Sequence, residues 1–381
     1  MTEPITERRI GYCTNVHPGA DLSSMLGNIG QCVAMIRTEL DEDELLPIGL
    51  WLSRETLDEA LRLPSGQLRG DLEKIGTMAF TLNGFPYGNF HKDRVKHDVY
   101  QPDWSRPERL RYTIDLADLL IDLIPPESTA GISTLPIGWS TVDEDRMEGA
   151  VVNLQQAADH LAAIEARTGH CLHIDLEPEP GCLLQRSEDV VELFEKRLLN
   201  VDNESIVRRH LRVCHDVCHA AVMFESQSEV VANYDSAGIQ IGKIQVSTAI
   251  EARGDDPDSM ERLRAFTEPR WLHQVSIRNE DGITFHEDLE RAIEQETLQP
   301  GDCWRIHFHV PVHRDRIESL PTTQSDLRQA IALLAGRPEI TDWEVETYAW
   351  NALPEAPEID ELAIGIADEI RWTRRHVESA S

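Results

Sequence analysis

Eight short apolar runs with the character of β-strands recur along the chain, and most are separated by stretches whose apolar residues have helical spacing. This alternation is typical of βαβ units, which build parallel sheets. The runs are centred near Tyr12, Gly49, Ala79, Ser133, Ile174, Val213, Ile244 and Val345. Eight β/α repeats favour an α/β fold closed into a (β/α)8 TIM barrel over an open sheet, with residues 1–381 forming one domain.

Local signals mark several of the intervening helices. Asp21 is a favourable N-cap ahead of apolar residues at helical spacing, and Pro107 is a favoured first helical residue. A third helix is expected over about 145–167, where Gly169 would end it. A last helix is expected over 359–372. Each would present one apolar face to the barrel.

The interval between the seventh and eighth strand-like runs is much longer than most of the others. Residues 251–341 contain three further candidate strands, at 271–277, 283–286 and 304–310. We interpret residues 251–341 as an insertion within the same domain. It should lie on the catalytic face, where βα loops of a barrel carry the active site.

The charge balance is strongly acidic, with 68 Asp and Glu against 36 Lys and Arg and a formal net charge of −32. The negative electrostatic field of such a chain repels polyphosphates, and the sequence has no basic run that would oppose it. Nucleic acid is therefore not an expected partner. Apolar segments fall short of the roughly 18 residues needed to span a bilayer, and the N-terminus lacks an apolar signal region. These patterns predict a cytoplasmic protein without direct membrane insertion.

A D-x-x-H motif, Asp216 to His219, falls where the sixth strand turns into a helix. A carboxylate and an imidazole three residues apart on this turn can address one point, which suits a borderline divalent cation such as Zn or Mn. The alternative is a histidine packed and hydrogen-bonded beneath a helix.

Further candidate ligands fall at corresponding places. Glu177 ends the fifth strand, His307 and His309 form an H-x-H pair in the insertion, and Glu346 lies towards the carboxyl end of the last strand. Buried salt bridges or core histidines would explain each one alone. Because all of them fall on one rim of the predicted barrel, we interpret them as a metal site together with the D-x-x-H motif.

A second group of residues suggests substrate contacts. The loop over 81–91 combines glycines and aromatic rings with Asn83, Asn89 and His91, so it could bind a polar ring or polyol, or form a self-packed loop. His17 follows the first strand, where a turn histidine is the alternative.

The seventh strand places Lys243 and Gln245 on one face. Lys243 is a candidate acid, base or charge clamp. His91 is a second candidate for proton transfer, and Gln245 is a candidate substrate contact. A lysine extending from the bottom of the barrel is the alternative interpretation of Lys243.

The order Glu, D-x-C-H, H-x-H and E-T resembles the xylose isomerase-like barrel superfamily, which includes sugar isomerases, sugar epimerases and endonuclease IV. Longer motifs, G-Y-C-T-N-V-H-P-G at 11–19, N-G-F-P-Y-G-N-F-H at 83–91 and V-Y-x-P-D-W at 99–104, resemble the EboE family of metabolite traffic proteins. That resemblance implies partner proteins of one pathway, including membrane-associated ones. Gln245 and His307 replace a histidine and an aspartate of the endonuclease pattern, so one or two ions are expected in place of three.

The leading hypothesis is a metal-dependent enzyme that isomerises or epimerises a small polar or sugar-like metabolite with Zn, Mn or Fe. One alternative is a non-catalytic carrier or scaffold that serves a membrane partner. Another is a metal-dependent phosphodiesterase resembling endonuclease IV, which would need a cationic groove.

Overall fold

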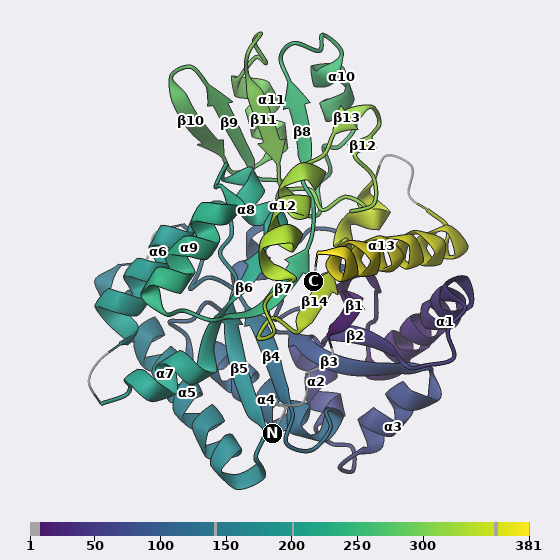
Figure 1. Ribbon diagram of the computed structural model, residues 1–381, viewed down its shortest axis with the longest axis vertical. Helices are drawn as coiled ribbons and strands as arrows, with labels where there is room; N and C mark the ends of the chain where they lie inside the picture. The colour runs from purple at the N-terminus through teal and green to yellow at the C-terminus, as the bar shows by residue number, and fades with distance from the viewer. Residues whose placement is uncertain (1–7, 141–142, 200–201, 354–356, 381) are drawn as a thin grey trace.

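The predicted (β/α)8 barrel is confirmed by a computed structural model that describes residues 8–140, 143–199, 202–353 and 357–380. Parallel strands close in the order β1-β14-β7-β6-β5-β4-β3-β2 (Figure 1). The barrel strands are β1 (Arg9–Cys13), β2 (Leu46–Trp51), β3 (Thr77–Asn83), β4 (Thr129–Thr134), β5 (Cys171–Leu176), β6 (Leu211–Asp216), β7 (Ile241–Val246) and β14 (Asp342–Val345). Each predicted run centre lies in one of them.

Helices fill the connections and surround the barrel. They are α1 (Leu22–Leu40), α2 (Arg54–Ala60), α3 (Gln67–Lys74), α4 (Pro107–Leu123), α5 (Glu144–Thr168), α6 (Ser187–Leu193), α7 (Glu204–His210), α8 (Val217–Val222), α9 (Gln227–Ala237), α12 (Gln324–Leu334) and α13 (Ile359–Ser379). In the described residues, no helix is both long enough and apolar enough to cross a membrane.

The predicted helix boundaries are largely confirmed. The Asp21 carboxylate accepts a hydrogen bond from the Ser24 backbone N–H at 2.8 Å and so caps α1. Pro107 is the first residue of α4, and Gly169 ends α5 with a left-handed φ of 78°. The last helix runs past its predicted end at 372, because Thr373 and Val377 continue its buried face.

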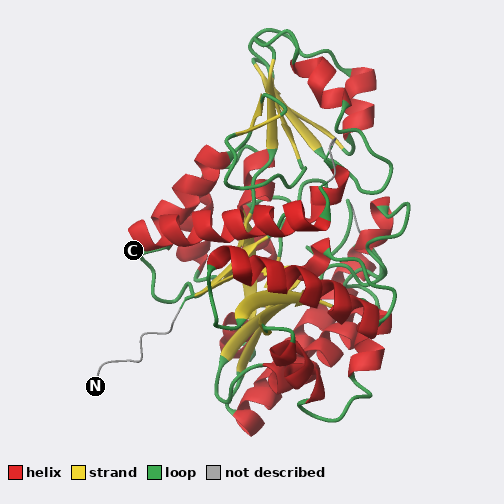
Figure 2. Cartoon of the chain, turned by 90° about the vertical axis from the view of Figure 1, so that its right-hand side faces the viewer, coloured by secondary structure: helices red, strands yellow, loops and turns green. Residues whose placement is uncertain are grey.

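The segment between β7 and β14 forms a small antiparallel sheet above the barrel (Figures 1 and 2). Its strands lie in the order β10-β9-β11-β8. They are β8 (Ile250–Arg253), β9 (Val275–Asn279), β10 (Gly282–His286) and β11 (Cys303–Ile306), and they are accompanied by α10 (Ser259–Arg264), α11 (Leu289–Gln295), β12 (Arg316–Ile317) and β13 (Leu320–Pro321). Its apolar side packs with Phe90 and Tyr348 of the barrel loops.

The predicted strand over 304–310 is shorter in the structure. It ends at Ile306, because the chain then leaves the sheet and crosses to the barrel rim. There the backbone N–H of His307 donates to the Gln274 carbonyl at 2.8 Å, and that of Val310 donates to the Thr248 carbonyl at 3.1 Å. The H-x-H pair therefore lies in the connection between sheet and barrel.

A charged layer fills the barrel below the rim. Lys243 forms an ion pair with Glu344, and both side chains are fully buried. A Cβ atom at Gly49 would lie only 1.3 Å from Glu344 Oε1, so a glycine is required to make room for this carboxylate. His173 Nδ1 and Asp175 Oδ1 form a second buried pair at 2.6 Å.

Candidate metal centre

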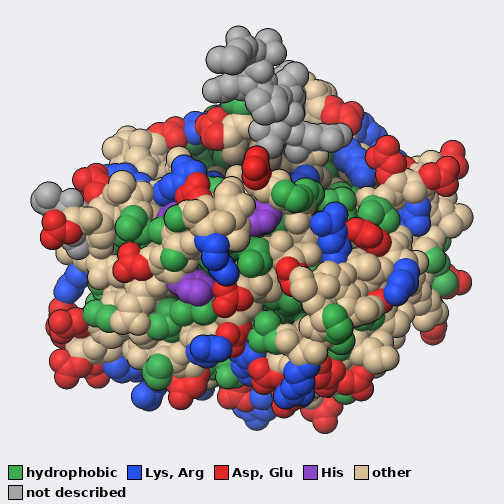
Figure 3. All heavy atoms as spheres, turned by 90° about the horizontal axis from the view of Figure 1, so that it is seen from below, with side chains coloured by type: hydrophobic (Ala, Val, Ile, Leu, Met, Phe, Trp, Pro, Cys, Tyr) green, Lys and Arg blue, Asp and Glu red, His purple; other side chains and the backbone are tan. Residues whose placement is uncertain are grey.

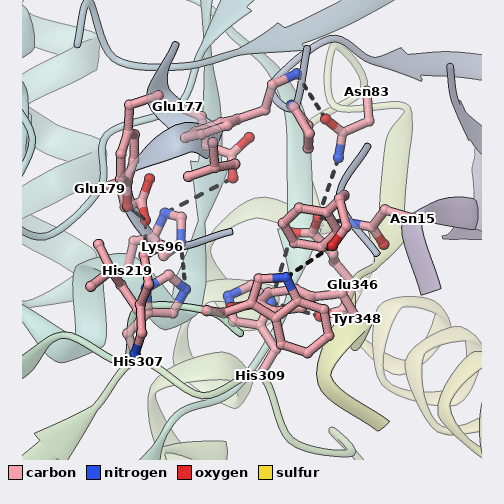
Figure 4. Close-up of a pocket in the computed structure, with 17 residues that line it drawn as sticks. Asn15, Asn83, Lys96, Glu177, Glu179, His219, His307, His309, Glu346 and Tyr348 are labelled. Atoms are coloured by element: carbon pink, nitrogen blue, oxygen red, sulfur yellow. Dashed lines mark hydrogen bonds and ion pairs between the residues drawn. The ribbon is translucent and has the colours of Figure 1, made fainter. Parts of the chain in front are cut away.

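The six predicted metal ligands come together at the carboxyl ends of the barrel strands. Figure 4 shows all of them except Asp216. Asp216 ends β6, and its side chain caps α8 by accepting from the backbone N–H of His219 at 2.8 Å. Glu177 directly follows β5, and Glu346 directly follows β14. His307 and His309 reach the same place from the insertion. All six side chains are buried.

The three histidines share one hydrogen-bonding pattern. His219 Nδ1 donates to the Pro178 carbonyl at 2.8 Å, and His309 Nδ1 donates to the Glu346 carbonyl at 2.8 Å. His307 Nδ1 donates to Gln274 Oε1 at 2.7 Å. Since these oxygens can only accept, each neutral imidazole carries its proton on Nδ1 and leaves the Nε2 lone pair free. Metal-binding histidines are typically oriented in this way.

The free lone pairs lie close to one another. Ligand atoms of Asp216, His219 and His309 lie within 4.8 Å of one another, and His307 adjoins His219. His219 Nε2 lies 3.1 Å from His307 Nε2 and 3.9 Å from Asp216 Oδ2, which is 3.8 Å from His309 Nε2. Bonds to zinc of about 2.0–2.2 Å place two ligand atoms roughly 3–4 Å apart. Asp216 Oδ2 and His309 Nε2 are buried and have no hydrogen-bond partner among the described residues. The donor set therefore fits a divalent cation.

A cluster of three carboxylate side chains adjoins the histidines. Asp216 belongs both to this cluster and to the histidine cluster. Oxygens of Glu177, Asp216 and Glu346 lie within 4.8 Å of one another. Burial, then the charges of Asp216 and Glu344, raise the pKa of Glu346 to about 8. Burial, then Glu346 and Asp216, likewise raise the pKa of Glu177 well above its usual value. A cation would relieve this repulsion, so the two overlapping groups could hold one or two ions.

Side-chain amides hold the carboxylates of the site in place. The Asn15 amide donates to Glu346 Oε1 at 2.7 Å, and that of Asn83 donates at 3.3 Å. The Gln274 amide donates to Glu179 Oε1 at 2.9 Å, which fixes the orientation in which its oxygen faces His307. Sequence reasoning missed Glu179 and Gln274 as site residues. Glu179 stands in the E-P-E-P run, which is a usable signal. Gln274 falls in the predicted strand over 271–277, but in the structure it lies in the irregular segment just before β9.

A pocket opens above these groups. Its free space is about 540 Å³, including the open mouth. Predicted ligands Glu177, His219, His307, His309 and Glu346 line its floor, together with Asn15 and Asn83. Residues from the insertion and from the loops after β3 form its walls, so the insertion completes the site.

Several predicted contact residues lie outside the described pocket lining. His17 is buried, and its Nε2 lies 2.9 Å from the Tyr12 hydroxyl. Asn89 is exposed, and its Oδ1 accepts from the backbone N–H of His91 at 2.8 Å. The ring of His91 packs edge-on against Trp51 behind the pocket wall.

The two predicted residues of β7 lie in the barrel interior, also outside the described lining. Lys243 contacts Glu344 and donates to the Ser133 hydroxyl at 3.0 Å. Gln245 is fully buried, and neither polar atom of its amide has a hydrogen-bond partner among the described residues.

Of three similar solved structures, the first supports the assignment of the fold. A xylose isomerase-like TIM barrel protein from Mycobacterium smegmatis, in complex with magnesium, aligns over 100% of this chain and 99% of its own, with 11% identity and a TM-score of 0.55. A xylose isomerase domain protein from Planctomyces limnophilus aligns over 98% and 97%, with 12% identity and a TM-score of 0.49. An IolI protein with a bound zinc atom aligns over 97% and 98%, with 12% identity and a TM-score of 0.47.

No family model matches the chain, and no curated protein matches it. Its similarity to solved structures shows that the chain has the fold of the xylose isomerase-like TIM barrels. Its buried His, Asp and Glu side chains form a candidate metal centre.

Proposed function

We propose that this protein binds one or two divalent metal ions at the barrel rim and isomerises or epimerises a small oxygen-bearing metabolite. The observation that carries this proposal is the grouping of Asp216, His219 and His309, whose ligand atoms lie within 4.8 Å of one another. These three residues would hold one ion. His307, whose Nε2 lies 3.1 Å from His219 Nε2, would be a neighbouring donor. Glu177 and Glu346, with Asp216 shared, would hold a second or complete the first. Zn, Mn and Fe all suit this mixture of imidazole and carboxylate.

A divalent ion bound here supplies a Lewis acid that polarises substrate oxygens. Glu177 Oε2 is buried without a hydrogen-bond partner among the described residues, and Glu177 lines the pocket. We assign to this oxygen the transfer of a proton from the hydroxyl-bearing carbon of the substrate to the neighbouring carbonyl carbon, as isomerisation requires. Asn15 and Asn83 hold Glu346 in place. Lys243 and His91 lie outside the described pocket lining, so their proton-transfer roles stay a prediction.

The hydrolysis of a phosphodiester is less well supported. Lys96 lies at the pocket, but its Nζ is paired with Asp288 Oδ2 at 2.5 Å. Together with the net charge of −32, this engaged lysine does not favour a polyanionic substrate. Figure 3 shows the face opposite the insertion, where acidic and basic side chains are interspersed.

The motif resemblance to the EboE family supports a place in metabolite traffic. We accordingly propose a cytoplasmic role alongside partner proteins of the same pathway, including membrane-associated ones.

Elemental analysis tests the metal centre directly. Protein purified without a metal-affinity column should contain Zn, Mn or Fe in stoichiometric amount, and the Asp216→Ala variant should lose it. Asp118→Ala, which removes an exposed carboxylate on α4, is the matched control and should keep the metal. Equal metal in the Asp216 variant, or no uptake by wild type after incubation with divalent ions, would refute the assignment.

Turnover is tested separately on the loaded protein. Proton NMR in D₂O should show deuterium uptake next to the carbonyl of a hydroxyketone substrate. A loaded protein that exchanges no proton in any compound of a hydroxyketone and sugar panel would favour the carrier alternative.

A further inference from the structure

The pocket has two chemically different surfaces. Its floor is the candidate metal centre, whereas much of its wall is apolar and aromatic. Wall residues include Phe85, Phe90, Val99, Trp271, Leu272 and Tyr348. They come from the loops after β3, from the insertion and from the segment after β14.

The aromatic part of the wall is a packed cluster that reaches the floor. The rings of Phe90 and Trp271 are stacked with centroids 5.2 Å apart, and Tyr348 packs edge-on against Trp271 at 5.2 Å. The Tyr348 ring also lies 4.9 Å from the ring of His309. A ligand bound to the metal would therefore contact this cluster directly (Figure 4).

Three polar groups near the wall are already engaged, whereas the Tyr348 hydroxyl has no hydrogen-bond partner among the described residues. The Tyr100 hydroxyl donates to Glu179 Oε1 at 2.7 Å, and Trp271 Nε1 donates to the Phe90 carbonyl at 3.2 Å. Lys96 is paired with Asp288. In contrast, the floor holds buried atoms without partners among the described residues, namely Asn15 Oδ1, Glu177 Oε2, Asp216 Oδ2 and His309 Nε2. Free capacity for polar contacts is thus concentrated at one end.

From this polarity we infer that the ligand is amphipathic. One end carries a metal-binding pair of oxygens, such as an α-hydroxyketone. The other end is an apolar body of about the size of an aromatic ring. This inference rests on the proposed function and narrows its substrate class. A free sugar would press hydroxyl groups against the wall without partners, which is unfavourable. An apolar body gains by leaving water, and apolar pockets with a few placed polar groups are the usual form of such sites.

A matched pair of probes tests the inference. 2-Hydroxyacetophenone and dihydroxyacetone share the hydroxyketone head, but only the former carries a phenyl ring. In ligand-observed NMR titrations of metal-loaded protein, 2-hydroxyacetophenone should bind at least about tenfold more tightly, because a phenyl group is buried. Equal affinities, or tighter binding of dihydroxyacetone or D-fructose, would overturn the inference.

Variants at Trp271 locate the effect. Trp271→Ala should abolish the difference between the two probes and leave dihydroxyacetone binding unchanged, whereas Trp271→Phe should retain most of it. Circular dichroism establishes folding, and Val99→Asn replaces Trp271→Ala if the latter does not fold. A preference for 2-hydroxyacetophenone that survives in whichever of these two variants folds would contradict a role for this wall.

Metal analysis of the same samples separates the two claims. If the protein holds metal but shows no preference for the phenyl probe, the inference fails and the metal centre stands. If it holds no metal, the proposed function fails, and acetophenone is used with the metal-free protein. Binding of acetophenone that Trp271→Ala removes would then support the apolar subsite, and absence of binding would overturn it.

Discussion

His219 and His307 face each other through their Nε2 atoms at 3.1 Å, while the Nδ1 atom of each donates to an oxygen that can only accept. Two lone pairs at this distance repel unless a proton or a metal ion lies between them. Burial, then the neighbouring His219 and His309, lower the pKa of His307 well below its usual value, so a bound proton is disfavoured. A divalent ion bound between them, as we propose, would remove this repulsion.

Gln274 should control metal affinity without binding the metal. Its Oε1 accepts from His307 Nδ1 at 2.7 Å, so Gln274→Leu frees the imidazole to rotate. We expect metal affinity to fall about 10–100-fold, as is usual for the loss of such a partner. Competition with a fluorescent chelator measures it. Gln156→Leu, on the exposed side of α5, is the control, and unchanged affinity in Gln274→Leu would contradict the assigned orientation.

Glu177→Gln should have opposite effects on the two forms of the protein. The metal-free form should gain on the order of 1–2 kcal/mol, because a buried carboxylate beside Asp216 and Glu346 is neutralised. The variant should lose the stabilisation by metal, which is about 2.7 kcal/mol at a concentration one hundred times the Kd. Urea unfolding with and without EDTA measures both. Glu339→Gln, an exposed change, should alter neither, and a destabilised metal-free Glu177→Gln would count against crowding of charge.

Lys243 can be tested as a structural charge. Lys243→Met leaves Glu344 buried and unpaired and should cost about 3–5 kcal/mol. Adding Glu344→Gln should recover most of this loss. If turnover returns with stability in the double variant, Lys243 is not the proton carrier. A stable double variant that stays inactive would support its catalytic role.

The pKa of His17 predicts an acid-dependent loss of stability. Burial, then the nearby His91, lower it from 6.5 to about 3. The unfolded chain therefore binds the proton more readily, and the stability contributed by neutral His17 is lost as the pH falls from 6.5 towards 3. His17→Gln should flatten this dependence by up to about 1.4 kcal/mol per pH unit.

Urea unfolding between pH 4 and 7 provides the measurement for His17. His97→Gln is the control, because its side chain is 46% exposed. Parallel curves for wild type and His17→Gln would show that His17 is protonated equally in both states.

The barrel and most of its candidate ligands could be predicted from the sequence for a physical reason. Strand and helix periods are local, so runs such as those at Ile174 and Val213 locate β5 and β6, and Glu177 and Asp216 follow from the strand ends. The roles of Gln274 and Trp271 could not be predicted from the sequence, because only the folding of the insertion onto the rim brings them to His307 and His309. The end of β11 at Ile306 likewise depends on contacts with Thr248 and Gln274.

The spread of the site along the chain bears on biosynthesis. Glu177 and Asp216 are made early, whereas His307, His309 and Glu346 follow only after the small sheet above the barrel has been synthesised. A nascent chain that ends before Glu346 lacks part of the donor set and cannot close the barrel, since β14 joins β1 to β7. A metal ion held by the full donor set would thus require synthesis of the chain at least as far as Glu346.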